Sequence, residues 1–439
     1  MATPEKTELT IFWFRRDLRL DDNVGLSQAL NSGFPVMPIF IYDKEILDNL
    51  ENKRDRRVDY FHQALQAINV DLNKSGGTLS TFYDQPMAVF KDLSEKYSIQ
   101  SIYCNRDYEP ATVKRDTEIY NYFKAQNIPF KACKDQVIFD KNEVVKNDGK
   151  PYTVYTPFAN AWRNILQPSD YESVKMNWKN LFQQPFKKTH SLAAIGFEKT
   201  DIEFKKPVLN STIIDSYDKT RDFPAQDGTT GLGIALRFGT ISIRKCVAFA
   251  LEHNRTWLSE LIWREFFMQI LYHFPKVIDH SFKTKYDNID WRNNETEFKK
   301  WCEGKTGYPL VDAGMRQLNE TGYMHNRVRM ITASFLVKDL LIDWRWGEAY
   351  FAEKLNDYDL AANNGNWQWV AGCGCDAAPY FRIFNPGTQV KKFDKDGEYI
   401  RRWLPELDTD NYPAPMVNHE AARERALLAY RKAVNASTE

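Results

Sequence analysis

Long hydrophobic runs are missing from this 439-residue sequence: no stretch of about 18 consecutive apolar residues occurs, the length that a transmembrane helix needs. The first residues, MATPEKTELTIFWF, also lack the basic start, apolar core and small-residue cleavage site of a signal peptide. Both absences argue against a membrane-spanning or secreted protein. We therefore expect a cytoplasmic protein with no membrane partner.

Cysteine and histidine are also scarce, with 6 and 7 residues. The cysteines are scattered along the chain, which fits a reducing compartment. Cys373 and Cys375 lie one residue apart, but no second pair of cysteines or histidines stands at metal-ligand spacing. The sequence therefore predicts no metal site.

Neither sign of charge is in excess, because Lys and Arg together number 59 and Asp and Glu together also number 59. Proteins that bind nucleic acid without sequence preference usually carry a basic stripe or a basic chain. The composition argues mildly against a nucleic-acid binder, and any contact with DNA has to be a local patch. Tryptophan, in contrast, is abundant, with 12 residues.

The first 135 residues alternate short β-rich runs with helical patterns. Apolar runs at Leu9–Phe14 and Val36–Tyr42 flank DDNVGLSQALNSG, a helical pattern that ends at Gly33. The strand-like pieces TLSTFY, QSIYCN and IPFKACK follow, each after a helical segment. This alternation predicts a doubly wound domain with a parallel sheet over residues 8–135. No G-x-G-x-x-G follows the first run, so the standard dinucleotide-binding fingerprint is absent.

From residue 136 to 210, prolines and lysines interrupt the pattern, which predicts a long linker with short helices. Its one strongly apolar piece, YTVYTPFANAWRN, is expected to dock on a domain. From residue 211 to 435 the periodicity is helical and no convincing strand occurs. The predicted fold class is therefore α/β plus all-α: a doubly wound N-terminal domain, a linker and a helical C-terminal domain.

The chemically richest stretch runs from Asn356 to Pro386, with two acids one residue apart and three asparagines in four positions. The run after Asp359 reads as a helix with Asp359 as its N-cap. In such a helix Asn363 and Trp367 share one face, whereas Trp369 points away from them. Because an unsatisfied buried amide costs about 1–3 kcal/mol, we expect this helix to line a polar-walled pocket for a large planar group.

Two further helical stretches carry unusual sets of side chains. In Trp257–Tyr272, Glu260, Trp263 and Arg264 are spaced i, i+3 and i+4, so they share one face. In Gly322–Lys338 the run HNRVRM gathers basic, amide and thioether groups. The alternative for the first stretch is a surface ion pair beside a core tryptophan. The alternative for the second stretch is a solvated basic face.

A fourth segment, Gly228 to Gly231, reads GTTG and precedes an apolar helical pattern. Backbone N–H groups and hydroxyls at a helix N-terminus form an anion site. The alternative is an ordinary threonine-capped helix.

Long motifs in these stretches carry a family resemblance. NDYDLAANNGNWQWVAG, followed by DAAPYFRIFNP, resembles the flavin-binding signature of the photolyase/cryptochrome family. The likeness extends from WFRRDLRLDDNVGL at Trp13–Leu26 to EYIRRWLPEL at Glu398–Leu407. The chain looks most similar to the class I photolyases that repair cyclobutane pyrimidine dimers. The resemblance implies FAD as cofactor, UV-damaged DNA as partner, and a monomer.

The resemblance also implies roles for individual residues. It pairs Arg329 with Asp357, makes Asp359 the acceptor of the flavin N3–H, and turns Asn363 towards flavin N5. The residues implied in FAD binding are Tyr217, Thr229, Thr230, Gly231, Leu232, Arg264, Arg329, Asp357, Asp359 and Asn363. The family often has serine where this chain has Gly233, which removes one hydroxyl contact.

For the reaction, the resemblance assigns the lesion pocket and an electron relay. The residues implied in lesion and DNA binding are Arg221, Glu260, Trp263, Asn326, Arg327, Met330 and Trp369. Those implied in catalysis are Glu260, Asn326, Arg327 and Asn363, with Trp291, Trp344 and Trp367 as the relay from surface to flavin. Of the basic residues around these motifs, Arg221, Arg327 and Arg382 or Arg401 are the expected phosphate contacts.

Three other functions are alternatives. A cryptochrome photoreceptor predicts a long polar C-terminal extension, whereas about 32 residues follow Leu407 here and end in a helical pattern. A plain flavin-binding module does not explain the set of lesion-pocket residues. A (6-4) photolyase needs histidines as proton donors on the helix that here reads HNRVRMITASF, and after His325 that helix offers an amide, a permanent cation and a thioether instead.

An antenna chromophore is left open. In the folate-binding branch of the family an Asn-Glu pair follows the Tyr-Glu step, whereas Tyr108-Glu109 is followed here by Pro-Ala-Thr. That difference argues against folate. A deazaflavin, a second flavin or no antenna remain as alternatives.

Overall fold

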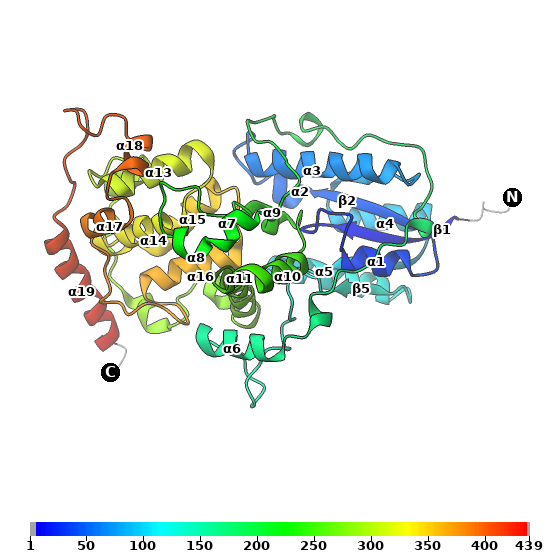
Figure 1. Cartoon of the computed structure of the whole chain (residues 1–439). Helices are drawn as coiled ribbons and strands as arrows, with labels where there is room; N and C mark the ends of the chain where they lie inside the picture. Colours follow the sequence, from blue (N-terminus) through cyan, green and yellow to red (C-terminus); the bar gives the residue numbers. More distant parts are fainter. Residues whose placement is uncertain (1–5, 437–439) are drawn as a thin grey trace. The chain divides into compact units, whose positions relative to one another are not determined.

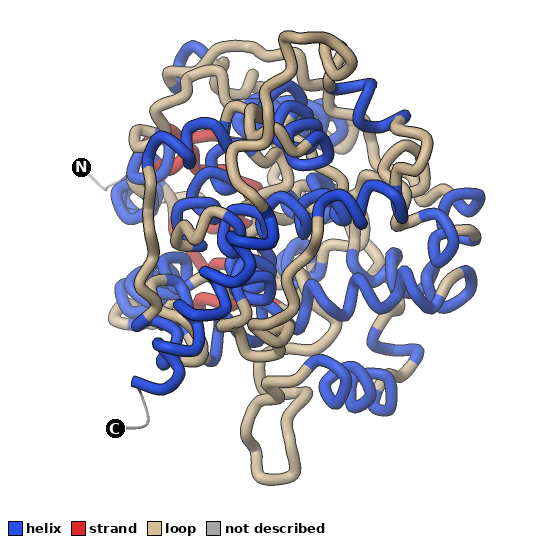
Figure 2. The backbone as a smooth tube through the Cα atoms, turned by 90° about the vertical axis from the view of Figure 1, so that its left-hand side faces the viewer, coloured by secondary structure: helices blue, strands red, loops and turns tan. Residues whose placement is uncertain are grey.

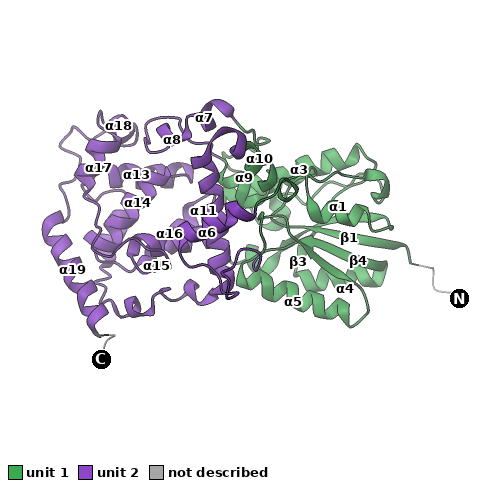
Figure 3. Cartoon of the chain, turned by 60° about the horizontal axis from the view of Figure 1, so that its bottom comes forward, with its two compact units in different colours: residues 1–140, 166–209, 232–249 green, residues 141–165, 210–231, 250–439 purple. Residues whose placement is uncertain are grey.

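The computed structural model describes residues 6–436 and divides into two compact units, each built from three stretches of chain (Figure 3). The sheet unit contains residues up to 140, 166–209 and 232–249, and the helical unit contains residues 141–165, 210–231 and 250 onwards. Residues 141–165, which the sequence places in the linker, thus pack with the helical unit.

The sheet unit holds one five-stranded sheet in the order β3-β2-β1-β4-β5, with every neighbouring pair parallel (Figure 1). This confirms the predicted doubly wound arrangement, because the strand order reverses between β1 and β4. The strands are β1 (Glu8–Phe14), β2 (Val36–Asp43), β3 (Ser80–Asp84), β4 (Ser98–Asn105) and β5 (Phe130–Cys133).

Alternate residues of β1 point to opposite faces of the sheet, as the period of a strand requires. Phe12 and Phe14 belong to a core cluster with α1 and α3, whereas Leu9, Ile11 and Trp13 belong to a second cluster with α4 and α5. Both faces are therefore covered, which explains why the strands read as continuous apolar runs. The covering helices are α1 (Val24–Leu30), α3 (Arg56–Asn73), α4 (Pro86–Lys96) and α5 (Pro110–Lys124).

Among the described residues, the helical unit consists of helices and loops, and the five strands belong to the sheet unit (Figure 2). Within residues 6–436, no helix is both long and apolar enough to cross a membrane. The elements that matter for the site are α6 (Tyr155–Ile165), α8 (Tyr217–Thr220), α11 (Arg255–His273), α14 (Asn326–Ser334), the π-helical turn η6 (Phe335–Asp339), α15 (Trp344–Lys354), α16 (Leu360–Ala371), α17 (Pro386–Phe393) and α19 (His419–Ala436).

The π-helical turn η6 buries a lysine in the core of the helical unit. The Lys338 ammonium donates to the carbonyls of Ala371 (3.0 Å) and Tyr380 (3.2 Å), and lies 3.6 Å from the centre of the Tyr430 ring. Its side chain is 1 % exposed. Burial lowers the pKa of Lys338 from its usual 10.5 to about 7.

This burial predicts a pH-dependent stability. Between the folded-state pKa near 7 and the usual 10.5 the unfolded chain holds the extra proton, so the free energy of unfolding rises with pH. From pH 7 to 8 the Lys338 contribution should be about 1 kcal/mol. Lys338→Met should lack this rise in urea titrations at the two pH values, and an unchanged rise would contradict the assignment.

Candidate functional site

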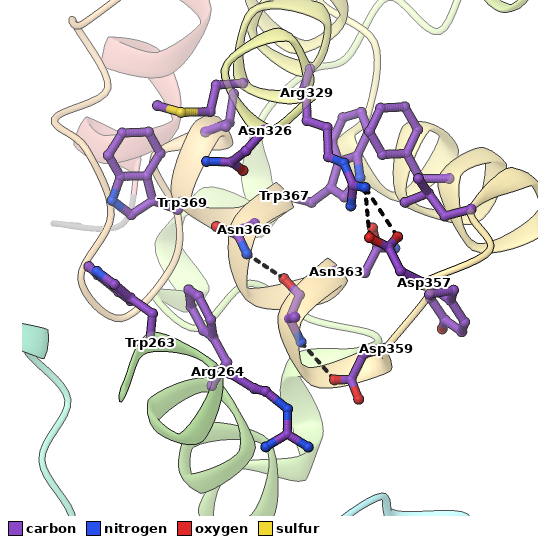
Figure 4. Close-up of a pocket in the computed structure, with 18 of the residues that line it drawn as sticks. Trp263, Arg264, Asn326, Arg329, Asp357, Asp359, Asn363, Asn366, Trp367 and Trp369 are labelled. Carbon is purple, nitrogen blue, oxygen red and sulfur yellow. Dashed lines mark hydrogen bonds and ion pairs between the residues drawn. The ribbon is translucent and has the colours of Figure 1, made fainter. Parts of the chain in front are cut away.

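A pocket of about 380 Å³ lies within the helical unit, bounded by α11, α14, α15, α16 and the segment before α16 (Figure 4). Its size lies in the range of small-molecule sites, and its wall mixes aromatic, amide and charged groups. The lining residues are Arg221, Glu260, Trp263, Arg264, Phe267, Asn326, Arg329, Met330, Ala333, Phe351, Leu355, Asp357, Tyr358, Asp359, Ala362, Asn363, Asn366, Trp367, Trp369 and Val370. The sequence predicted such a polar-walled pocket beside the helix that follows Asp359, which is α16.

Helix α11 forms one wall. Glu260, Trp263 and Arg264 all line the pocket, as their shared helical face predicts. Glu260 forms its ion pair with Arg221, which lies 39 positions earlier in the chain. Burial raises the pKa of Glu260, while Arg221 acts to lower it. The site therefore holds a carboxyl group that is easier to protonate than an exposed one.

Helix α14 lines the same pocket. His325 caps the helix by accepting from the Arg327 N–H at 3.1 Å, and burial lowers the His325 pKa to about 4. Asn326, Arg329 and Met330 line the pocket.

Arg327 has a different environment from its neighbours on α14. Its guanidinium donates to Asp222 at 2.6 Å and lies 4.4 Å from the centre of the Phe393 ring. The structure thus places Arg327 in an ion pair beside α17, whereas the other residues proposed for the lesion line the pocket.

The pocket wall opposite Trp263 and Trp369 carries an ion pair (Figure 4). Arg329 donates to both oxygens of Asp357, at 2.9 and 3.1 Å, and to the carbonyl of Met324 at 2.7 Å (Figure 4). Both contacts to Asp357 come from the Arg329 Nη2, while Nε is held by the Met324 carbonyl, so the guanidinium is anchored at two of its nitrogens. Next to it, the Asp359 carboxylate accepts from the Ala362 N–H at 3.2 Å, which is the N-cap that the sequence predicted.

Helix α16 presents an oriented amide to the pocket. The Asn363 Nδ2 donates to the Glu348 carboxylate at 2.8 Å and to the Glu348 carbonyl at 3.1 Å. Burial raises the pKa of Glu348. Trp369, which the helical spacing sets on a different face from Asn363 and Trp367, lines the same pocket. The cavity follows α16 around more than one face, which a single helical stripe does not describe.

The GTTG segment crosses the division between the two compact units. Thr229, Thr230 and Gly231 belong to the helical unit, and Leu232 belongs to the sheet unit, where it precedes the short helix α9 (Gly233–Phe238). The Thr229 hydroxyl lies 3.3 Å from the Tyr323 hydroxyl.

Tyr217 lies on α8, close to the pocket-lining residue Arg221. The Arg221 guanidinium is 5.6 Å from the centre of the Tyr217 ring. Burial raises the pKa of Tyr217, so its hydroxyl stays protonated at neutral pH.

The three tryptophans of the implied relay belong to one hydrophobic cluster. Trp367 and Trp344 are 3 % and 1 % exposed, and the partly buried Trp291 packs against the same cluster. Trp367 contacts Phe351 edge-to-face at 5.0 Å. The Trp344 indole N–H has no hydrogen-bond partner among the described residues. The packing of this cluster therefore allows a path of indoles from the partly buried Trp291 to Trp367 at the pocket wall.

Sequence reasoning missed several side chains that shape the pocket. Glu348, which orients Asn363, and Asp222, which pairs with Arg327, carry no local signal, because their partners lie 15 and 105 positions away. Asn366 lines the pocket and could have been found, since it lies within the predicted helix. Tyr155 lies on the apolar piece that was expected to dock, and it contacts Trp263.

The residues of the pocket fit a flavin. A flat ring system needs apolar walls, and Trp367, Phe351 and Leu355 supply them. It also needs acceptors and donors at its edge, which Asp357, Asp359 and the oriented amide supply.

Comparison with known proteins also indicates a flavin-binding domain. The model of the FAD binding domain of DNA photolyase matches residues 257–410, and the DNA photolyase model matches residues 10–176. Deoxyribodipyrimidine photo-lyases of Synechococcus sp. and Escherichia coli are each 37 % identical to this chain, which covers 96 % and 98 % of their lengths and is itself covered to 96 %.

Solved structures agree with these matches. A class III photolyase of Agrobacterium tumefaciens superposes with a TM-score of 0.87 at 34 % identity, covering 99 % of both chains. A cryptochrome of Synechocystis sp. gives 0.82 at 25 % identity, covering 97 % of this chain and all of the other. The chain belongs to the DNA photolyase family.

Proposed function

We propose that this protein is a deoxyribodipyrimidine photolyase, which uses blue light to split cyclobutane pyrimidine dimers in DNA. The observation that carries this proposal is that a single pocket is lined by five of the ten residues implied for the flavin and by six of the seven implied for the lesion. Electron transfer requires such proximity. The cofactor is FAD, which when bound, reduced and excited by light supplies the electron that splits the dimer.

The chain's own residues would position the two partners. Arg264, Arg329, Asp357, Asp359 and Asn363 would hold the flavin, with Tyr217 and the Thr229–Leu232 segment as further contacts. Glu260 and Asn326 would hydrogen-bond the base carbonyls, while Trp263 and Trp369 would contact the apolar face of the dimer. Arg221 and Arg327 would supply positive charge at the lesion and the phosphates.

Binding requires the dimer to leave the duplex. Enzymes that act on bases, photolyases among them, extrude the target at a cost of a few kcal/mol, which is lowest for damaged and poorly paired bases. Specificity can then come from the pocket, with local phosphate contacts adding affinity. This accounts for a nucleic-acid-binding enzyme with equal numbers of basic and acidic residues.

The lesion choice is supported by His325. Repair of a (6-4) photoproduct moves a hydroxyl group between bases and needs a proton donor, but the His325 pKa of about 4 leaves this imidazole neutral near pH 7. Splitting a cyclobutane dimer needs no net proton transfer. We therefore favour the dimer over the (6-4) lesion, and an enzyme over a cryptochrome receptor.

A second chromophore is an open part of the proposal. A photolyase structure of Sulfolobus tokodaii is described with two FAD molecules, one implicated as a novel light-harvesting cofactor. In this chain Glu109 accepts from Arg16 (2.7 Å) and Arg237 (2.8 Å). Mass spectrometry of the chromophores released from the purified protein would identify any antenna, with FAD expected in either case.

We further propose a cytoplasmic monomer in which residues 8–135 form the antenna-type domain, 136–210 the linker, and 211–435 the domain for FAD and DNA.

The function itself is tested by illuminating the reduced protein with an oligonucleotide that contains one thymine dimer. Blue light should restore two thymines, and a sample kept in the dark should stay unchanged. Equal amounts of dimer after light and dark would refute the proposal.

Asp359→Ala should lower the flavin content of the purified protein severalfold. The substitution removes the proposed acceptor of the flavin N3–H and the N-cap of α16, and loss of a cap costs about 1 kcal/mol. Asp359→Asn keeps the capping oxygen but not the charge, so it separates the two effects. Flavin absorbance per protein after dialysis is the measurement, and full retention in Asp359→Ala would show that the pocket assignment is wrong.

A further inference from the structure

Helix α6 is separate in sequence from the other helices of its unit, yet it packs along α11 (Figure 3). The Trp162 indole donates to the Glu265 carboxylate at 2.7 Å, and the Phe158 and Phe266 rings lie 5.3 Å apart. Both sides of this contact are buried, so α6 is a fixed part of the wall behind α11. Its first residue, Tyr155, lies next to the pocket-lining face.

Tyr155 stacks on Trp263, the tryptophan that lines the pocket. The two ring centres are 3.6 Å apart and the planes differ by 5°. The Tyr155 hydroxyl donates to the Ser259 carbonyl at 2.9 Å, one turn before Trp263 on α11. At the other end, the Tyr155 backbone N–H donates to the Asp376 carboxylate at 2.9 Å. The tyrosine is therefore held at both its backbone and its hydroxyl.

This geometry is imposed by the surroundings. Aromatic pairs prefer offset or edge-to-face contacts with centres about 4.5–7 Å apart, because face-to-face rings bring like parts of their quadrupoles together. Trp263 makes contacts of the preferred kind with Phe266 (5.7 Å, 80°) and Phe267 (5.4 Å, 28°). The closer Tyr155 contact is maintained by the two hydrogen bonds that anchor the tyrosine.

We propose that Tyr155 is a positioning residue for damage recognition: it covers one face of Trp263 and fixes the plane on which a flipped-out pyrimidine dimer stacks. The inference rests on the proposed function, since it takes Trp263 as the stacking partner of the lesion. It adds a residue that lies outside the set of pocket-lining side chains and comes from a different part of the chain.

The physical reason is preorganisation. A base gains stacking energy only from a ring that lies parallel to it, and a ring that must first be ordered loses part of that energy as conformational entropy. Tyr155 excludes water and bases from one face of the indole, so a base meets only the surface turned towards the pocket. Phosphate contacts do not depend on the plane of the Trp263 ring, so the affinity for undamaged DNA should not depend on Tyr155.

The test compares dark binding of two fluorescent duplexes, one with a single thymine dimer and one undamaged. Tyr155→Leu should weaken binding of the dimer duplex about tenfold and leave the undamaged duplex and the flavin content unchanged. Tyr155→Phe keeps the ring and should retain most of the preference. The matched control is Tyr272→Leu, which removes a tyrosine of α11 whose hydroxyl accepts from the Lys141 ammonium.

A double-mutant cycle distinguishes action of Tyr155 through Trp263 from a general structural role of Tyr155. If Tyr155 acts through Trp263, Tyr155→Leu should have no further effect on damage preference in a Trp263→Leu background. Additive losses, or equal losses for both duplexes, would overturn the inference, as would a Tyr155→Phe variant as impaired as Trp263→Leu. If the unaltered protein itself does not prefer the dimer duplex, the proposed function fails; if it does and Tyr155→Leu keeps the preference, only this inference fails.

Discussion

Trp367→Phe should lower the rate of light-driven reduction of the oxidised flavin by external donors about 100-fold or more. Trp367 is the one residue of the proposed relay that lines the pocket, and Trp344 and Trp291 belong to the same hydrophobic cluster. Phenylalanine fills most of the space but is much harder to oxidise than an indole. The bleaching of flavin absorbance under blue light in the presence of a thiol measures this rate.

Repair by Trp367→Phe protein that has been reduced with dithionite should be close to that of the unaltered protein, because the relay recharges the flavin and takes no part in dimer splitting. Trp346→Phe is the matched control. Trp346 belongs to the same cluster and contacts Phe298, and the relay does not include it. Normal photoreduction in Trp367→Phe, or an equal loss in Trp346→Phe, would remove the relay from this account.

Asp357→Leu should destabilise the flavin-free protein by about 3 kcal/mol, because it leaves the guanidinium of Arg329 without a carboxylate in a largely enclosed site. The exposures of the two side chains are 25 % for Arg329 and 18 % for Asp357, which favours the low end of the range for buried pairs. Flavin content should fall as well. Thermal melting and flavin absorbance provide the two measurements.

The double variant Arg329→Met/Asp357→Leu separates the two effects. With neither charge present, no unpaired ion remains, and replacing both members of a buried pair by apolar residues is often neutral. Stability should therefore return, whereas flavin content should stay low if this pair contacts the cofactor. A double variant that binds flavin normally would show that the ion pair only supports the fold.

Much of the fold follows from local pattern. The strands are visible in the sequence as short β-rich runs that alternate with helical patterns, and the helical remainder as a period of about 3.6. The Asp359 cap and the common face of Glu260 and Trp263 are equally local, because they depend on spacings of three or four residues.

The parts that could not be predicted depend on long-range contacts. Arg264 is the i+4 neighbour of Glu260, but the carboxylate pairs with Arg221 across 39 positions. The docking of α6 was expected from its apolar composition, whereas the stacking of Tyr155 on Trp263 brings together two residues that are 108 positions apart. That Trp369 and Trp367 line one pocket from different faces of α16 could not be predicted either, because a helical wheel gives the face of a residue but not the extent of the cavity around it.

The most direct test of the account is a repair assay on two matched oligonucleotides, one with a thymine cyclobutane dimer and one with a (6-4) photoproduct at the same position. The protein, reduced with dithionite, is illuminated with blue light, and the products are separated by chromatography. The account predicts complete conversion of the dimer to thymines and no conversion of the (6-4) lesion, since Asn326 and Met330 at the pocket wall cannot act as general acids and the lowered pKa of His325 leaves it neutral near pH 7. Repair of the (6-4) lesion without activity on the dimer would contradict it.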